Sequence, residues 1–321
     1  MLDVFFTFDV EVWCDGWEGI DVRFPDAFHR YIYGSTSRGN YGLPYQLRQL
    51  SEHGLTGVFF VEPLFSTRFG LDPLAEIIGL IQEHGHEIQL HLHTEWVDES
   101  RHPLLANIKG KKQFLRYFSL EEQIILIQAG ATLITRAGGP HSVEAFRAGS
   151  FGFNRDTLRA LAVSGIPFDS SYNVSLYGPD SGISPKIPLV EPMECHGVHE
   201  YPMTVFRDGT SLLRHAQITA CSYWEMEGLL WQALESRRNA FVILSHNFEL
   251  LNRRMNRPDD IVVARFRKLC SFLDRHRDCF RVRGFHGLSP TEVLSQPLPL
   301  TSPIWKTGVR MLEQGLRWGF G

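Results

Sequence analysis

His86-Glu87-Ile88-Gln89-Leu90-His91-Leu92-His93 is the stretch that indicates the fold, because a largely apolar run ends there in two histidines two positions apart. A second apolar run, Val4-Phe5-Phe6-Thr7-Phe8, ends in a similar way at Asp9 and Glu11. Side chains at positions i and i+2 of a β-strand point to the same face. We therefore expect two strand ends, each presenting a pair of side chains that can bind a metal ion.

Two carboxylates and two imidazoles suit a divalent cation such as Zn²⁺. A metal site with one carboxylate to spare is typical of enzymes that hydrolyse an ester or an amide with activated water. The alternative for His91 and His93 is the ordinary buried histidine that hydrogen-bonds within the core, and the alternative for Asp9 and Glu11 is a solvated strand end.

The rest of the chain repeats a pattern of short β-rich runs followed by helical runs, which predicts an α/β fold with a largely parallel sheet, open or closed into a barrel. Expected strands cover 3–9, 56–62, 86–91, 144–148, 166–169, 201–206, 240–245 and 280–283. Expected helices cover 44–53, 72–84, 119–136, 154–164, 222–237 and 259–276. Three stretches are too long for simple connections, 12–42, 92–118 and 173–200. We expect these insertions to surround the site, since strand ends carry the chemistry in such folds.

Composition narrows the class of protein. The chain has 321 residues, of which 43% are hydrophobic and 21% are charged, as in ordinary globular proteins. A formal net charge of −4 gives no footprint for nucleic-acid binding. Five cysteines without CxxC spacing argue against a disulfide framework and a cysteine-based zinc site. With no apolar run of bilayer length and no signal segment, we expect a cytoplasmic protein.

Further candidate residues stand at the ends of other expected strands. Arg147 could hold a carboxylate in its ionised form, and His246, after the apolar run 241–245, could act as a general acid. Asp169 could orient that histidine or bind substrate. Trp96 and Tyr172 lie in the insertions, where flat aromatic rings could stack on sugars or simply pack the loops.

Five segments in this order resemble the NodB-type polysaccharide deacetylases, carbohydrate esterase family four. Thr7-Phe8-Asp9-Val10-Glu11 resembles the first motif of the family, usually TFDDG, and Phe59-Phe60-Val61 resembles its second strand. Gly85 to His91 resembles the second motif, Phe146 to Gly152 the third, and Leu244-Ser245-His246 the last. The likeness covers most of the chain.

The resemblance implies a deformed (β/α) barrel with long loop insertions, here residues 1–300, followed by an amphipathic helix over 301–321. It also implies one divalent metal ion, with zinc preferred. Asp9 matches the catalytic base of the family. Val10 stands where the metal-binding aspartate belongs, so we expect Glu11 to replace it; Glu95 stands where the second histidine belongs, so we expect His93 as the ligand and Glu95 as its reserve.

By the same resemblance, His91 binds the metal, Arg147 orients the base and His246 is the general acid. Asp9 would take a proton from the attacking water, and His246 would protonate the departing amine. With these departures from the usual motifs, the chain is similar to the deacetylase-like proteins of lipopolysaccharide and exopolysaccharide gene clusters. The expected reaction is removal of N-acetyl or O-acetyl groups from a sugar or glycan intermediate. Two alternatives stay open: hydrolysis of another C–N bond in a small metabolite, and a glycan-binding barrel without activity.

Two other segments suggest partners. The run 107–112 is basic and could meet an anionic part of the substrate, or could be a solvated loop. Residues 303–320 read as a helix with an apolar stripe of Trp305, Val309, Leu312 and Leu316. This stripe could lie on the inner face of a membrane or pack against the barrel.

Overall fold

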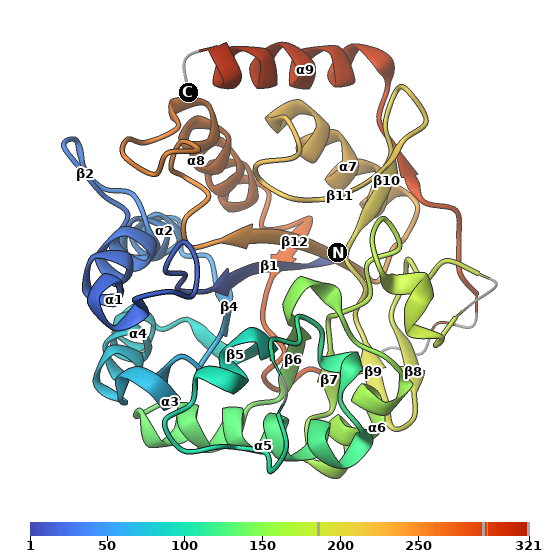
Figure 1. The fold of residues 1–321 in the computed structure, drawn as a ribbon. Coiled ribbons are helices and arrows are strands. Elements are labelled where there is room, and N and C mark those ends of the chain that lie inside the picture. Colours follow the sequence, from blue (N-terminus) through green and yellow to red (C-terminus); the bar gives the residue numbers. More distant parts are fainter. Residues whose placement is uncertain (109, 185–186, 291–292, 294, 320–321) are drawn as a thin grey trace. The chain divides into compact units, whose positions relative to one another are not determined.

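The computed structural model describes residues 1–108, 110–184, 187–290, 293 and 295–319 (Figure 1). Contacts divide the chain into two compact units. Unit 1 comprises Met1–Gly57, Thr204–Gly284 and Leu298–Gly321, and unit 2 comprises Val58–Met203 and Phe285–Pro297. The helix α9 (Ile304–Gly319), expected from the sequence as a separate C-terminal segment, belongs to unit 1.

Unit 1 is centred on the parallel strands β1 (Leu2–Val10) and β12 (Ala240–His246), and β13 (Phe280–Val282) also pairs with β1. Phe5, Phe6 and Phe8 are fully buried. A strand buried on both faces needs such a continuous apolar run, as parallel sheets usually do. The register of β1 and β12 pairs Asp9 with His246, so the two parallel strands end side by side.

Helices and short hairpins complete unit 1. Its remaining helices are α1 (Ile20–Phe28), α2 (Leu43–Glu52), α7 (Tyr223–Glu235) and α8 (Asp260–Arg275), with a π-helical turn at His29–Tyr33. Its remaining strands are β2 (Ser35–Thr36), β3 (Gly39–Asn40), β10 (Val205–Arg207), β11 (Leu213–His215) and β14 (Leu300–Thr301). Figure 1 shows α7 and α8 on one side of β1 and β12, with α9 beyond them.

Unit 2 carries a run of parallel strands in the order β4, β5, β6, β7, β9, with β8 antiparallel to β9. Their bounds are β4 (Gly57–Val61), β5 (Glu87–Leu92), β6 (Ala145–Ala148), β7 (Phe168–Asp169), β8 (Met193–Cys195) and β9 (Val198–Glu200). The helices are α3 (Ser66–Phe69), α4 (Asp72–Glu83), α5 (Leu120–Arg136) and α6 (Arg155–Val163). Short 3₁₀ turns lie at Thr94–Glu99, Leu115–Tyr117, Gly149–Phe151 and Gly178–Ser181.

Local signals in the sequence explain where several helices begin. Ser119 and Ser222 each form a capping box with the glutamate three residues later, at the starts of α5 and α7. Helix α5 lies close to β5 because Gly130 lacks a side chain: a Cβ there would lie 2.8 Å from Leu92. Figure 1 shows α5 and α6 together on one side of the strands of unit 2.

The predicted α/β alternation with a mainly parallel sheet is confirmed. Most predicted bounds agree with the structure to within two residues, but the strand expected at 201–206 is β10, over Val205–Arg207. Helix α1 was missed because it lies inside the insertion 12–42 and contains Pro25, which interrupts a helical pattern. Among the described residues, no helix combines the length and the apolar character needed to span a membrane.

Candidate metal and catalytic site

The ends of β1 and β12 bring together Asp9, Glu11 and His246. One ligand atom from each of these residues lies within 4.8 Å of the others. The Nε2 atom of His246 is 4.0 Å from the Oδ2 atom of Asp9 and 3.9 Å from the Oε1 atom of Glu11. Both carboxylates are buried, whereas His246 is partly exposed. The arrangement places two acids beside one imidazole that solvent can reach.

Glu11 is held on both its backbone and its side chain. The amide of Asn247 accepts a hydrogen bond from the backbone nitrogen of Glu11, 3.0 Å, and donates one to its carbonyl oxygen, 3.1 Å. The indole nitrogen of Trp13 donates to the Oε2 atom of Glu11 over 2.6 Å. Asn247 and Trp13 were not among the predicted site residues. The signal for Trp13 was its position two residues after Glu11.

His246 is oriented by Glu249, another residue that the sequence did not indicate. The Nδ1 atom of His246 is 2.7 Å from the Oε1 atom of Glu249. Burial would lower the pKa of His246, but the hydrogen bond and the charge of Glu249, together with the charges of Glu11 and Asp9, outweigh it and raise the pKa to about 9. The folded chain therefore favours the protonated imidazole at neutral pH.

Unit 2 presents His91 and His93 at the end of β5. The Nδ1 atom of His91 donates to the backbone carbonyl oxygen of Arg147 over 2.8 Å, since a carbonyl can only accept. The Nδ1 atom of His93 is 3.3 Å from the Oε2 atom of Glu95. Partners of this kind on Nδ1 fix the ring and direct Nε2 toward a metal ion. Glu95, predicted as a reserve ligand, thus serves as the hydrogen-bond partner of His93.

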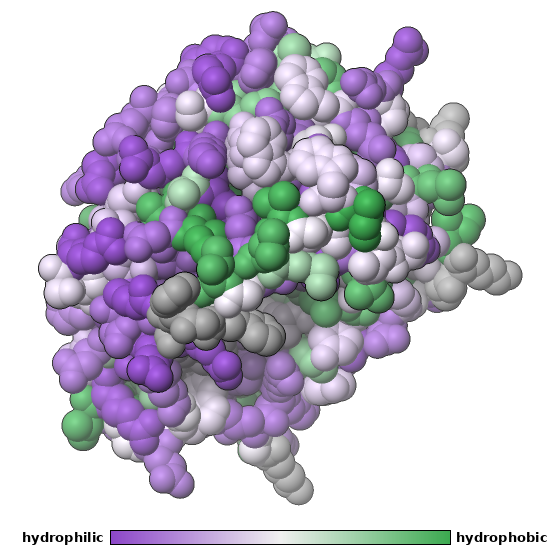
Figure 2. All heavy atoms as spheres, turned by 90° about the horizontal axis from the view of Figure 1, so that it is seen from above, coloured by the Kyte–Doolittle hydropathy of each residue, from purple (hydrophilic) through white to green (hydrophobic). Residues whose placement is uncertain are grey.

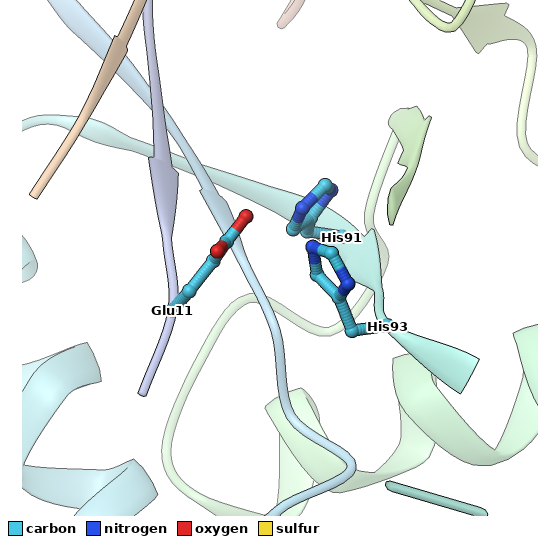
Figure 3. Close-up of side chains that lie close together, drawn as sticks. All are labelled: Glu11, His91 and His93. Carbon is cyan, nitrogen blue, oxygen red and sulfur yellow. The ribbon is translucent and has the colours of Figure 1, made fainter. Parts of the chain in front are cut away.

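Glu11, His91 and His93 form a second group of potential ligands, and Figure 3 shows their side chains directed toward one another. One ligand atom from each lies within 4.8 Å of the other two, and all three residues are buried. One carboxylate oxygen and two imidazole nitrogens are a donor set that zinc proteins use. The donor types of the three predicted ligands suit a divalent ion, and their assignment as ligands stays a prediction.

Arg147, on β6, is buried and paired within unit 2. Its Nε atom donates to the backbone oxygen of Ser170 and its Nη2 atom to the hydroxyl of the same residue, both over 3.1 Å. Its guanidinium also lies over the ring of Phe60, 4.3 Å from the centroid. These contacts hold the side chain in place. The expected role of Arg147 in orienting Asp9 stays a prediction.

The structure buries the three residues that were expected to bind substrate, which argues against that role. Trp96 is only 1% exposed and packs edge-on against Phe65 and Phe69. Tyr172 and Asp169 have no exposed surface. A buried ring has no free face on which a sugar could stack, so these side chains belong to the core of unit 2 in this conformation.

Asp169 instead pairs with Glu200 on the neighbouring strand β9. Burial raises the pKa of both carboxyl groups, and the charge of Asp169 raises that of Glu200 further. The two carboxyl groups thus lie on neighbouring strands in the core of unit 2, where burial favours their neutral forms. This role in packing explains an acidic residue at a buried strand end without a substrate.

The basic run 107–112 is partly neutralised by acids of its own unit. The amino group of Lys111 lies 2.6 Å from the Oε1 atom of Glu99 and also contacts Asp98. The amino group of Lys112 lies over the ring of Phe118, 4.4 Å from the centroid. Lys109 is outside the described residues. The run therefore offers less free positive charge than its sequence suggests.

No family profile and no curated protein matches the sequence. Solved structures do match. A Mycobacterium smegmatis protein assigned as a polysaccharide deacetylase aligns with a TM-score of 0.56 and 19% identity, over 92% of this chain and 94% of that one. The chain shares its fold with that protein. A 4-alpha-glucanotransferase from Thermococcus litoralis aligns with a TM-score of 0.55 and 9% identity, over 92% of this chain and 42% of that one. At these identities the likeness is one of fold, and it confirms the predicted fold class.

Proposed function

We propose that the chain is a metal-dependent hydrolase that removes acetyl groups from nitrogen or oxygen of a sugar or glycan intermediate in cell-surface polysaccharide biosynthesis. The observation that carries the proposal is the group of Glu11, His91 and His93, with Asp9 and His246 beside Glu11. The fold shared with a protein assigned as a polysaccharide deacetylase supports a glycan as the class of substrate.

In this proposal Glu11, His91 and His93 hold one divalent ion, with zinc the best match to the donor set. When bound, such an ion polarises an acyl carbonyl and lowers the pKa of water. Each of the three side chains is held by a neighbour: Trp13 donates to Glu11, the carbonyl of Arg147 accepts from His91, and Glu95 contacts His93.

Asp9 and His246 have the positions and charges for the two proton transfers. As water attacks the acetyl carbonyl carbon, Asp9 accepts a proton from that water. As the bond between carbonyl carbon and sugar nitrogen breaks, His246 gives its proton to the nitrogen, which leaves as an amine. The raised pKa of His246 supports its role as an acid, since the proton is present at neutral pH. Arg147 is proposed to keep Asp9 ionised.

The test is acetate release from a panel of N- and O-acetylated nucleotide-sugars and oligosaccharides, with chain loaded with zinc and with chain treated with a chelator. The proposal predicts release from at least one substrate class, and loss of release after chelation. A zinc-loaded, folded chain that releases acetate from no member would contradict it. Binding of oligosaccharides without turnover would instead favour the inactive glycan-binding alternative, and turnover of cyclic amides would favour the small-metabolite alternative.

A further inference from the structure

Helix α9 presents an apolar face to solvent. Ile304, Trp305, Met311, Leu312 and Leu316 are each more than half exposed, with Leu312 the most exposed at 72%. Their spacing of 1, 7, 8 and 12 residues from Ile304 places all of them on one face of the helix. Surface helices of globular proteins usually turn such a face to the core. We call these five residues the α9 face.

The opposite side of α9 is charged, and ion pairs hold it against the rest of unit 1. Arg310 is only 1% exposed and bonds to Asp208 over 2.7 Å and to Glu225 over 3.2 Å. Arg317 bonds to Asp259, 2.6 Å, and Glu313 to Arg265. Arg310 is buried and cannot turn outward without taking a cation away from buried Asp208 and Glu225, so these ion pairs fix the orientation of the α9 face.

Other apolar residues of unit 1 are also exposed. Trp224 on α7 is 46% exposed and adjoins Glu225, which contacts Arg310. Leu212 and Leu298 are also exposed, and both belong to unit 1. Figure 2, which views the molecule from above Figure 1, shows apolar side chains gathered across this surface. An apolar surface of this extent generally marks an interaction site.

A basic groove that Trp224 lines indicates which kind of partner covers the α9 face. The groove has a volume of about 600 Å³, and Trp224 lines it together with Tyr223 and the three cations Arg267, Lys268 and Arg275. In the described part of the chain none of these three cations forms an ion pair with a carboxylate. Glu52 is the one carboxylate among the residues that line the groove.

We propose that the α9 face docks on a lipid bilayer surface that carries anionic headgroups. Its apolar side chains enter the boundary of the acyl chains, tryptophans lie at the headgroup level, and the basic groove meets lipid phosphate. A second copy of the chain fits less well, because a two-fold contact over this surface would bring two basic grooves together. This inference is independent of the proposed hydrolysis, since it concerns binding only.

The test is flotation of the full chain with vesicles of phosphatidylcholine alone and of phosphatidylcholine mixed with phosphatidylglycerol. Binding is expected for the mixed vesicles and should weaken as salt increases. The triple variant Trp305→Ser, Leu312→Ser, Leu316→Ser should lose at least about tenfold in affinity. The double variant Arg267→Glu, Lys268→Glu should lose the preference for phosphatidylglycerol.

A matched control is Ile125→Ser, which changes a 45% exposed residue of α5 in unit 2 and should leave vesicle binding unchanged. Circular dichroism should show that all variants stay folded, since only exposed side chains change. The proposal is overturned if the full chain binds neither kind of vesicle, or if the triple variant binds as tightly as the unchanged chain. A dimer in sedimentation that the triple variant dissociates, without vesicle binding, would assign the α9 face to a second copy instead.

Discussion

The proposed proton transfer to Asp9 can be tested by a substitution that replaces one carboxylate oxygen with an amide nitrogen. Asp9→Asn keeps the shape of the side chain and removes its ability to accept a proton, so acetate release should fall by about 10²-fold or more. Its metal content, measured by elemental analysis, should stay that of the unchanged chain. Asp26→Asn, at an exposed position of α1, is the control and should keep full activity. Loss of metal in Asp9→Asn would show that Asp9 is a ligand, in the group it forms with Glu11 and His246.

Glu249 sets the charge of His246, and this effect can be measured without substrate. The folded chain raises the pKa of His246 to about 9 through Glu249, Glu11 and Asp9, against the lowering effect of burial. Glu249→Gln removes a negative charge and should lower that pKa toward its ordinary value of about 6.5. The readout is an NMR titration of the imidazole in metal-free protein, with Glu121→Gln at an exposed position as control.

The same shift makes stability depend on pH. The pKa of His246 is higher in the folded state than in the unfolded state, so the protonated form stabilises the fold. This contribution is complete below about pH 6.5 and is lost as the pH rises through about 9. Unfolding experiments across this window should show a smaller decline in stability for Glu249→Gln than for the unchanged metal-free chain. An equal decline in both would contradict the assigned role of Glu249.

At the scale of elements, the turn after β6 supports the histidines at the end of β5. Gly149 leaves room there: a Cβ would lie 2.8 Å from the Nδ1 atom of His93 and 2.7 Å from the carbonyl oxygen of Leu92. Gly149→Ala should displace His93 and weaken zinc affinity by about tenfold, as the loss of a contact that positions a metal ligand does. Gly79→Ala on α4 is a matched control, because a Cβ there meets nothing within 4 Å. Equal zinc affinity in the two variants would refute this account of Gly149.

The orientation of helix α9 depends on the buried side chain of Arg310. Arg310→Met leaves Asp208 and Glu225 buried without their shared cation. Breaking a buried charge pair from one side typically costs about 3–5 kcal/mol of unfolding free energy. Chemical denaturation should show a loss of this size, whereas Arg254→Met at an exposed position should change little. A loss below about 1 kcal/mol in Arg310→Met would mean that other contacts orient α9.

The positions of helices and strands were easier to predict from the sequence than the contacts between them. Apolar runs that end in polar residues located β1, β5 and β12, and capping serines located the starts of α5 and α7. The contacts between distant segments were not predictable. Trp96 is buried because Phe65 and Phe69 pack on it, and sequence position alone could not distinguish this from a ring exposed to substrate.

At the scale of the whole molecule, the sequence indicated candidate ligands for the site but not the residues that contact Glu11 and His246. Glu11, His91 and His93 were chosen from spacing and from a family resemblance, and their role as ligands stays a prediction. Asn247 and Glu249 were not predicted, because their roles depend on the strand register that pairs the end of β12 with the end of β1. The ion pairs on the inner side of α9 could likewise not be predicted, because the acidic partners lie far away in sequence. These partners are Asp208, Glu225 and Asp259.

The most direct test of the central claim is the zinc content of the full chain and of His91→Ala after both are loaded with zinc and dialysed. The proposed site predicts about one zinc ion per unchanged chain and nearly none in His91→Ala, because two remaining protein ligands bind zinc weakly. His29→Ala, at an exposed position outside the ligand group, should retain its zinc. Full zinc occupancy in a folded His91→Ala variant would contradict the metal site, and with it the proposed hydrolase.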